Sequence, residues 1–136
     1  MQRTLSYLLP ALLLSTAVAC ATTVQAPTDA PALGSDAKIV AKKNKTGNYA
    51  ISVNISNLAP ANRLDGEATA FVVWLINQDQ PAVRAGTLAY DEGDRAGSLE
   101  ATSPNALFTV LITLEKEPAP ASPNGKGILT AKIAAR

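Results

Sequence analysis

Hydrophobic and polar residues alternate with a period of two along most of the chain from residue 38 onwards. The clearest case is the segment 49–56, in which Tyr, Ile, Val and Ile occupy every second position and small or polar residues lie between them. This alternation predicts a β-strand with one face in a core and one face in water. The 3.6-residue period of an amphipathic helix is not found in this part of the sequence.

Further segments carry strand patterns and are separated by Gly, Pro, Asn and Asp, which favour turns. The predicted strands cover residues 38–42, 49–56, 67–77, 83–90, 96–102, 107–115 and 126–133. Seven short strands with closely spaced turns predict an all-β fold, an antiparallel two-sheet sandwich of the immunoglobulin-like kind, over residues 36–136. The pattern leaves the order of the strands open.

The predicted strand 67–77 is apolar on both faces. One face holds Ala68, Ala70, Val72, Trp74 and Ile76, and the other holds Phe71, Val73 and Leu75. Only one face of a strand in a sandwich points inward, so the other face is covered by a loop such as 58–60 or is an apolar patch that awaits a partner. We take Phe71, Val73 and Leu75 as the candidate interaction patch. Trp74 is then expected to fill the space between the sheets.

Residues 1–19 have the layout of a secretory signal peptide. Arg3 precedes an apolar run over residues 5–14, and small residues at 17–19 close the segment. The run is shorter than the about 20 residues that a membrane helix needs, and Pro10 interrupts it. We therefore expect an exported protein whose mature form has no transmembrane span.

Residues 17–20, Ala-Val-Ala-Cys, are compatible with two kinds of processing. Cleavage after Ala19 by a general signal peptidase gives a soluble secreted or periplasmic protein. Alternatively, the four residues resemble a bacterial lipobox, with Ala17 where Leu is usual, and Cys20 is lipidated. Cys20 is the only cysteine, so it forms no intramolecular disulfide, and acylation gives its thiol a role. We favour the lipoprotein, with a membrane as its partner through this N-terminal lipid.

Ala21 indicates in which membrane the protein is anchored, and the composition of residues 20–35 indicates how flexible this segment is. Ala21 stands where Asp would indicate retention at the inner membrane, so the periplasmic side of the outer membrane is favoured. Residues 20–35 are small, polar and interrupted by two prolines. This composition predicts a lipidated cysteine followed by a flexible tether of on the order of 20–25 Å.

The charge balance and the residue types exclude several functions. Without Arg3, the 12 Lys and Arg residues become 11, which equals the 11 Asp and Glu residues, so nucleic acid is not an expected partner. The chain has no histidine, which excludes Ser-His-Asp and Cys-His catalysis and the usual zinc sites. We expect no enzyme, no cofactor and no metal. A hydrolase using carboxylates alone lacks a recognisable pair of acids.

Two charged turns have alternative interpretations. The segment 91–94 carries three carboxylates, which suit calcium, but a solvated hairpin tip in which Gly93 supplies a positive φ explains them as well. Lys42, Lys43 and Lys45 form a cationic turn that is either a plain solvated turn or a contact for anionic lipid. We favour the plain turn in both cases.

Three segments resemble the extracytoplasmic domain of anti-sigma-K factors. They are residues 71–76 (Phe-Val-Val-Trp-Leu-Ile), 85–88 (Ala-Gly-Thr-Leu) and 110–117 (Val-Leu-Ile-Thr-Leu-Glu-Lys-Glu), the last followed by Ser-Pro-Asn-Gly at 122–125. The resemblance covers roughly residues 66–130 and implies a β-sandwich without catalytic residues. Anti-sigma-K factors carry a cytoplasmic sigma-binding segment and a membrane helix where this chain has a signal peptide and Cys20, so sigma-factor binding is not implied.

These observations predict a non-enzymatic lipoprotein of the cell envelope, with a β-sandwich that acts as a binding or structural module. The alternative is an envelope sensor that contacts an anti-sigma-type membrane protein through the patch near Phe71.

Overall fold

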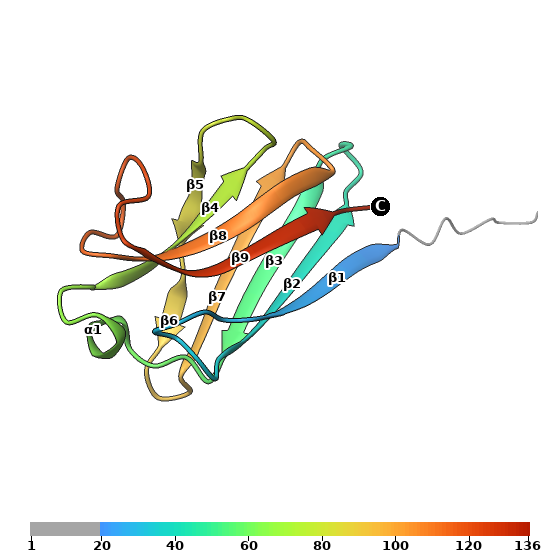
Figure 1. Cartoon of the computed structure of the whole chain (residues 1–136). Helices are drawn as coiled ribbons and strands as arrows, with labels where there is room; N and C mark the ends of the chain where they lie inside the picture. The colour runs from blue at the N-terminus through green and yellow to red at the C-terminus, as the bar shows by residue number, and fades with distance from the viewer. Residues whose placement is uncertain (1–19) are drawn as a thin grey trace, which may run out of the picture.

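The computed structural model describes residues 20–136, which form two antiparallel β-sheets packed face to face (Figure 1). The predicted signal peptide, residues 1–19, lies outside the described residues. The elements are β1 (Ala21–Pro27), β2 (Asp36–Lys43), β3 (Tyr49–Ser56), α1 (Ala61–Leu64), β4 (Ala70–Ile76), β5 (Val83–Thr87), β6 (Ala89–Asp91), β7 (Ala96–Ser103), β8 (Leu107–Glu115) and β9 (Lys126–Ala134). Within residues 20–136, no helix has the length and apolar character needed to cross a bilayer.

The strand order is β1-β2-β3-β7-β6 in one sheet, called sheet A, and β5-β4-β8-β9 in the other, called sheet B. Every pairing is antiparallel. Without β1, sheet A has the order A-B-E-D of an immunoglobulin domain, and β4-β8-β9 has the order C-F-G. The predicted fold class, an all-β antiparallel sandwich, is confirmed.

The predicted strand 83–90 is divided between the two sheets. β5 pairs with β4 in sheet B, and β6 pairs with β7 in sheet A. Leu88 lies at the crossing, where its side chain is buried and its N–H donates to Phe71 O at 2.9 Å. The alternation of period two continues through the crossing, so the sequence pattern shows one strand where the structure has two.

The flexible tether predicted for residues 20–35 is wrong. β1 pairs with β2 along its whole length, from Ala21 opposite Lys42 to Pro27 opposite Asp36. Val24 and Ala26 pack against the core, and every second residue of the strand, from Ala21 to Pro27, is exposed. β1 is an edge strand, where the missing N–H of a proline disturbs no second ladder. The sandwich therefore begins at residue 21, directly after Cys20.

The turn between β1 and β2 is also built into the domain. The Thr28 hydroxyl lies 2.5 Å from Ala32 O and 3.1 Å from Ser35 O, and Ser35 Oγ donates to Asn57 O at 3.0 Å. The Asp29 N–H donates to Ile128 O of β9 at 2.7 Å. Thr28 and Ser35 are both buried, so this turn closes one end of the sandwich.

The substitution Thr28→Val is expected to lower the free energy of unfolding by about 1–3 kcal/mol, because it leaves buried carbonyl groups without their donor. Urea denaturation of the purified protein measures this change. Thr130→Val, at an exposed position of β9, is the matched control and is expected to change stability by less than about 0.5 kcal/mol. Equal stability of the two variants would indicate that the turn is not ordered.

The core lies between the sheets and contains buried residues of β2, β3, β4, β8 and β9, among them the predicted interaction patch; partly buried residues of β1, β5, β6 and β7 pack against it. Phe71, Val73 and Leu75 are only 2%, 0% and 7% exposed and belong to this core. The prediction that they form an outer patch is therefore wrong. Trp74 is buried as predicted but lies on the opposite face of β4, outside the core cluster, and does not fill the space between the sheets.

Candidate functional site

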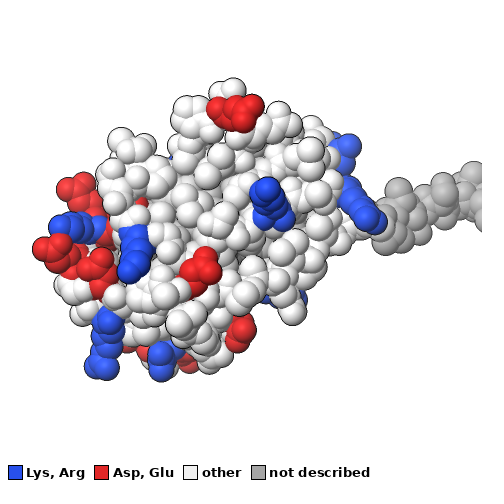
Figure 2. Space-filling model, in the orientation of Figure 1, with Lys and Arg blue, Asp and Glu red and all other residues white. Residues whose placement is uncertain are grey.

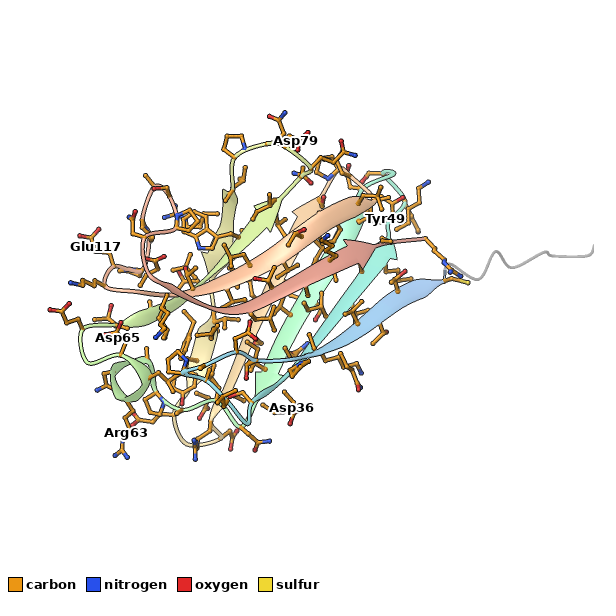
Figure 3. All side chains as sticks on the ribbon, in the orientation of Figure 1. Asp36, Tyr49, Arg63, Asp65, Asp79 and Glu117 are labelled. Carbon is orange, nitrogen blue, oxygen red and sulfur yellow. The ribbon has the colours of Figure 1, made fainter. Side chains whose placement is uncertain are left out.

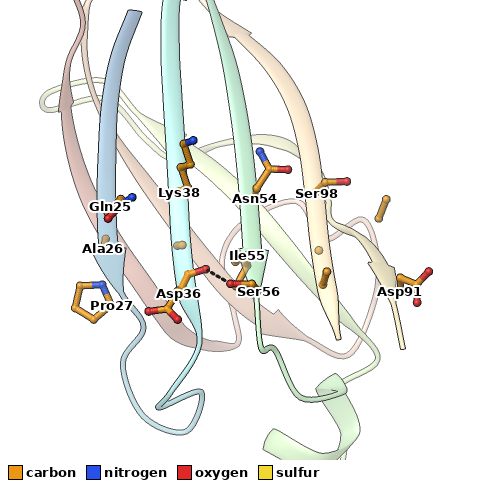
Figure 4. Close-up of a pocket in the computed structure, with 14 residues that line it drawn as sticks. Gln25, Ala26, Pro27, Asp36, Lys38, Asn54, Ile55, Ser56, Asp91 and Ser98 are labelled. Atoms are coloured by element: carbon orange, nitrogen blue, oxygen red, sulfur yellow. Dashed lines mark hydrogen bonds between the residues drawn. The ribbon is translucent and has the colours of Figure 1, made fainter. Parts of the chain in front are cut away.

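The outer face of sheet A carries a row of polar side chains that crosses four strands. Gln25 of β1 is opposite Lys38 of β2, Lys38 is opposite Asn54 of β3, and Asn54 is opposite Ser98 of β7. Residues that are opposite in neighbouring strands point to the same face of a sheet, so these side chains lie side by side, as Figure 4 shows. All four are exposed. We call these four residues the polar row.

The polar row borders an open depression of about 820 Å³. Asp36 and Ser56 line the depression on one side of the row, and the Ser56 hydroxyl approaches Asp36 O at 3.5 Å (Figure 4). Ala89, Ala96 and Gly97 line it from β6 and β7. Ala89 is opposite Ser98, and Ala96 lies two residues from Ser98 in the same strand, so both have the outward direction of the polar row. Their small side chains leave the sheet surface hollowed beside the row, whereas the open side of Gly97 faces Leu88 and Leu58 in the core.

The alternation along the strands explains why polar groups gather on this face. In β2, Ala37 and Ile39 point into the core, so Lys38 between them points outward. In β3, the residues on either side of Asn54 likewise belong to the core, so Asn54 points outward. The alternation over residues 49–56 predicts Asn54 as water-facing, but it does not give the register that places Asn54 in a row with residues of other strands. The polar row was therefore missed at the sequence level.

Most hydrogen-bonding groups of the polar row are directed to solvent. Asn54 Nδ2 donates to Ser52 Oγ at 3.0 Å, and Ser52 Oγ donates to Glu100 Oε1 at 2.7 Å, which orients the Asn54 amide. Lys38 makes no salt bridge with any of the described residues. The row thus offers amide, hydroxyl and ammonium groups to a polar ligand.

The outer face of β4 is covered by a loop, but not by the predicted segment 58–60. Trp74 Nε1 donates to Thr113 Oγ1 at 2.9 Å, and Thr113 Oγ1 donates to Glu115 Oε1 at 2.6 Å. The Asn124 N–H donates to the same carboxylate oxygen at 3.1 Å. Glu115 is only 3% exposed. The loop 116–125 therefore joins a buried hydrogen-bonded network on this face.

Two further hydrogen bonds hold the loop 116–125 against sheet B. Thr87 Oγ1 donates to Pro118 O, and Arg84 Nη1 donates to Pro120 O at 3.4 Å. Thr87 is opposite Val72 and Arg84 is opposite Trp74, so the loop crosses the apolar outer residues of β4. The apolar face is covered by the chain itself.

The acidic turn after β6 is an exposed hairpin tip. Asp91 Oδ1 accepts a hydrogen bond from the Asp94 N–H at 2.9 Å, which closes the turn. The positive φ lies at Arg95 (51°) and not at Gly93, so the expected role of the glycine is wrong. Within residues 20–136, no group of three or more His, Cys, Asp or Glu side chains is placed to hold a metal ion.

Tyr90 joins this end of sheet A to the core. Its hydroxyl donates to Leu58 O at 2.6 Å, and its ring centroid lies 5.4 Å from that of Phe71. Burial raises the pKa of the Tyr90 hydroxyl above its usual value; the charge of Arg95 opposes this change, and Glu92 and Asp91 add to it. The folded protein therefore favours the protonated phenol.

A pKa of Tyr90 that is raised on folding contributes stability that is present below about pH 10 and is lost as the pH rises through the folded pKa. Tyr90→Phe is expected to lower the free energy of unfolding by about 1 kcal/mol at pH 8, through loss of the hydrogen bond to Leu58. The difference from the wild type should shrink above pH 10. Urea denaturation at pH 8 and pH 11 measures it, and a constant difference would contradict the expectation.

No protein-family model matches the chain, and no curated protein or solved structure is significantly similar to it. The resemblance of residues 66–130 to the extracytoplasmic domain of anti-sigma-K factors stays a prediction.

Proposed function

We propose that this chain is a non-enzymatic lipoprotein of the cell envelope whose β-sandwich binds a polar ligand on the outer face of sheet A. The observation that supports a binding role is the polar row, which presents solvent-directed hydrogen-bonding groups beside an open depression. The membrane anchor rests on Cys20, which is exposed and directly precedes β1. No spacer separates Cys20 from the sandwich.

The residue types of the polar row suit a hydroxyl-rich ligand. The amides of Gln25 and Asn54 each offer both donors and an acceptor, which is the combination that a hydroxyl group uses. Four strands at about 4.8 Å spacing give the row a length of about 14 Å. An extended chain such as an envelope polysaccharide matches this length and this chemistry.

The alternative function is an envelope sensor that contacts an anti-sigma-type membrane protein through an exposed apolar patch near Phe71. The structure has no exposed patch at these residues. Phe71, Val73 and Leu75 are in the core, and the opposite face of β4 is covered by the loop 116–125. A sensor would need a different surface, so the binding module is the better-supported proposal.

The test is binding to isolated cell-wall polysaccharide by co-sedimentation. The double variant Lys38→Ala/Asn54→Ala is expected to bind at least about tenfold more weakly, because two hydrogen bonds to the ligand are lost. The double variant Thr130→Ala/Lys132→Ala changes exposed residues of β9 in sheet B and is the matched control. Absence of binding by the wild type, or an equal loss in both variants, would reject the polysaccharide ligand.

A further inference from the structure

The end of the sandwich at which β1 begins carries a cluster of lysines. Ala21 is opposite Lys42, and Lys43 is opposite Tyr49 at the base of the hairpin between β2 and β3. Lys42, Lys43 and Lys45 are all exposed. The fold therefore places the cationic turn beside Cys20, although more than 20 residues separate them in the sequence. We call this the lysine end.

The hairpin that carries Lys45 is ordered by its own hydrogen bonds. Asn44 Oδ1 accepts from the Thr46 N–H at 3.0 Å, from the Thr46 hydroxyl at 2.6 Å and from the Asn48 N–H at 3.0 Å. The Asn44 N–H also donates to Asn48 O at 2.7 Å. The ammonium group of Lys45 is thus presented from a defined loop and not from a disordered one.

The last strand ends at the lysine end as well. The Arg136 N–H donates to Thr22 Oγ1 at 3.2 Å, and Figure 1 shows the end of the chain beside the start of β1. Leu107 is opposite Ala134 and is 54% exposed, so an apolar side chain lies near the same end. Cationic and apolar groups that share one end match the composition of surfaces that bind at lipid interfaces.

The two ends of the sandwich differ in charge although the described chain is neutral. The loops at the lysine end, 44–48, 77–82 and 104–106, hold one carboxylate, that of Asp79, and one cationic side chain, that of Lys45; Lys42 and Lys43 at the end of β2 add two further cations. The loops at the opposite end hold six carboxylates and three cationic side chains; they are 28–35, 57–69, 92–95 and 116–125. In Figure 2, blue side chains flank the start of the described chain and most red ones lie at the far end.

The separation follows the long axis of the strands. Asp36 begins β2 and Lys43 ends it, a distance of about 24 Å along a strand. Figure 3 places Tyr49 at the end that holds Lys43, and Asp65 and Glu117 at the other end. An anionic surface would attract the lysine end and repel the acidic end, which gives the domain a preferred orientation.

We infer that the lysine end docks on anionic phospholipid headgroups, with Lys42, Lys43 and Lys45 as the contacting cations. The inference rests on the lipid anchor of the proposed function, because an acylated Cys20 brings these three ammonium groups to the bilayer surface. Each cation near an anionic bilayer strengthens binding roughly fivefold, so three contribute about 100-fold. In this orientation the strands run roughly along the membrane normal. The end of the depression that Pro27 and Asp36 line then points away from the lipid.

The experiment uses the full chain expressed in cells and the processed protein isolated from them. Its intact mass shows whether Cys20 is acylated, which tests the anchor separately. The protein is added to vesicles of phosphatidylcholine alone or with about 30% phosphatidylglycerol, and the rate of lysine acetylation is measured by mass spectrometry. We expect Lys42, Lys43 and Lys45 to react about fivefold more slowly on the anionic vesicles, and Lys116 and Lys126 to react at unchanged rates.

The variants add a second readout. For the unacylated protein, the triple variant Lys42→Gln/Lys43→Gln/Lys45→Gln is expected to lose about 100-fold in partitioning onto anionic vesicles, and Lys116→Gln/Lys126→Gln is expected to bind like the wild type. Equal acetylation rates on both vesicles, or protection of Lys116 and Lys126, would overturn the docking. If the mass shows no acyl group but the three lysines are protected, the anchor is rejected and the docking is supported. If the mass shows acyl groups but the three lysines are not protected, the anchor is supported and the docking is rejected.

Discussion

Gly125→Ala is expected to lower the free energy of unfolding by about 3 kcal/mol or more. A Cβ atom at this position would lie 1.5 Å from Leu114 O and 2.6 Å from Leu114 C, both backbone atoms of β8. The loop 116–125 has to move away, and the Asn124 N–H then leaves the buried Glu115 carboxylate. The cost combines steric strain with the loss of a donor to a buried charged group.

Urea denaturation measures this loss, and the fluorescence of Trp74, the only tryptophan, reports on the loop directly. Displacement of the loop 116–125 exposes Trp74 to water and shifts its emission to longer wavelength. Gly127→Ala is the matched control, because its Cβ would meet Leu111 Cδ1 at 3.5 Å, an ordinary contact, and we expect a loss below about 1 kcal/mol. Equal stability of the two variants would show that the loop is not packed on β4.

Cys20→Ser is expected to move the protein from the membrane fraction to the soluble fraction of the cell. Under the proposed function, the thiol of Cys20 carries the lipid, and serine provides no thiol for it. Two acyl chains give stable anchoring at about 0.8 kcal/mol for each buried methylene group, so their loss removes the main attachment to the bilayer. The three lysines alone hold the domain only weakly.

Cell fractionation followed by intact mass measurement checks this expectation. Ala21→Ser is the matched control, since it makes a similar change at the next residue and leaves the thiol in place. A wild-type protein that is soluble after cleavage behind Ala19 would show the alternative processing and would reject the anchor.

The alternation of apolar residues predicted the sandwich because each side chain in a strand is assigned to a face by its position alone. The same rule failed for β4, in which both faces are apolar and the pattern gives no reason to choose between Phe71 and Trp74. In the structure, the loop 116–125 covers the face of β4 that carries Trp74, where Pro118, Pro120 and Asn124 make hydrogen bonds, and the face that carries Phe71 lies between the sheets. That contact joins segments about 40 residues apart, which a local pattern does not reveal.

β1 and the polar row were missed for related reasons. The residues of β1 are mostly small and polar, and only Thr22, Val24 and Ala26 mark its inward face. The composition therefore indicates a flexible segment more strongly than this weak alternation indicates a strand. The members of the polar row come from four strands, and only the register of those strands aligns them. Fold class was therefore accessible from the sequence, and the site required the pairing of strands.

The position of β1 has a mechanical consequence. If the chain is held by its cysteine, any pull on the domain enters through this strand and runs along its length. The hydrogen bonds between β1 and β2 lie across that direction, so they are loaded together in shear and are not opened one after another. A ligand that drags on the outer face of sheet A would thus strain the whole seven-residue ladder at once, a geometry suited to a domain that bears tension at its point of attachment.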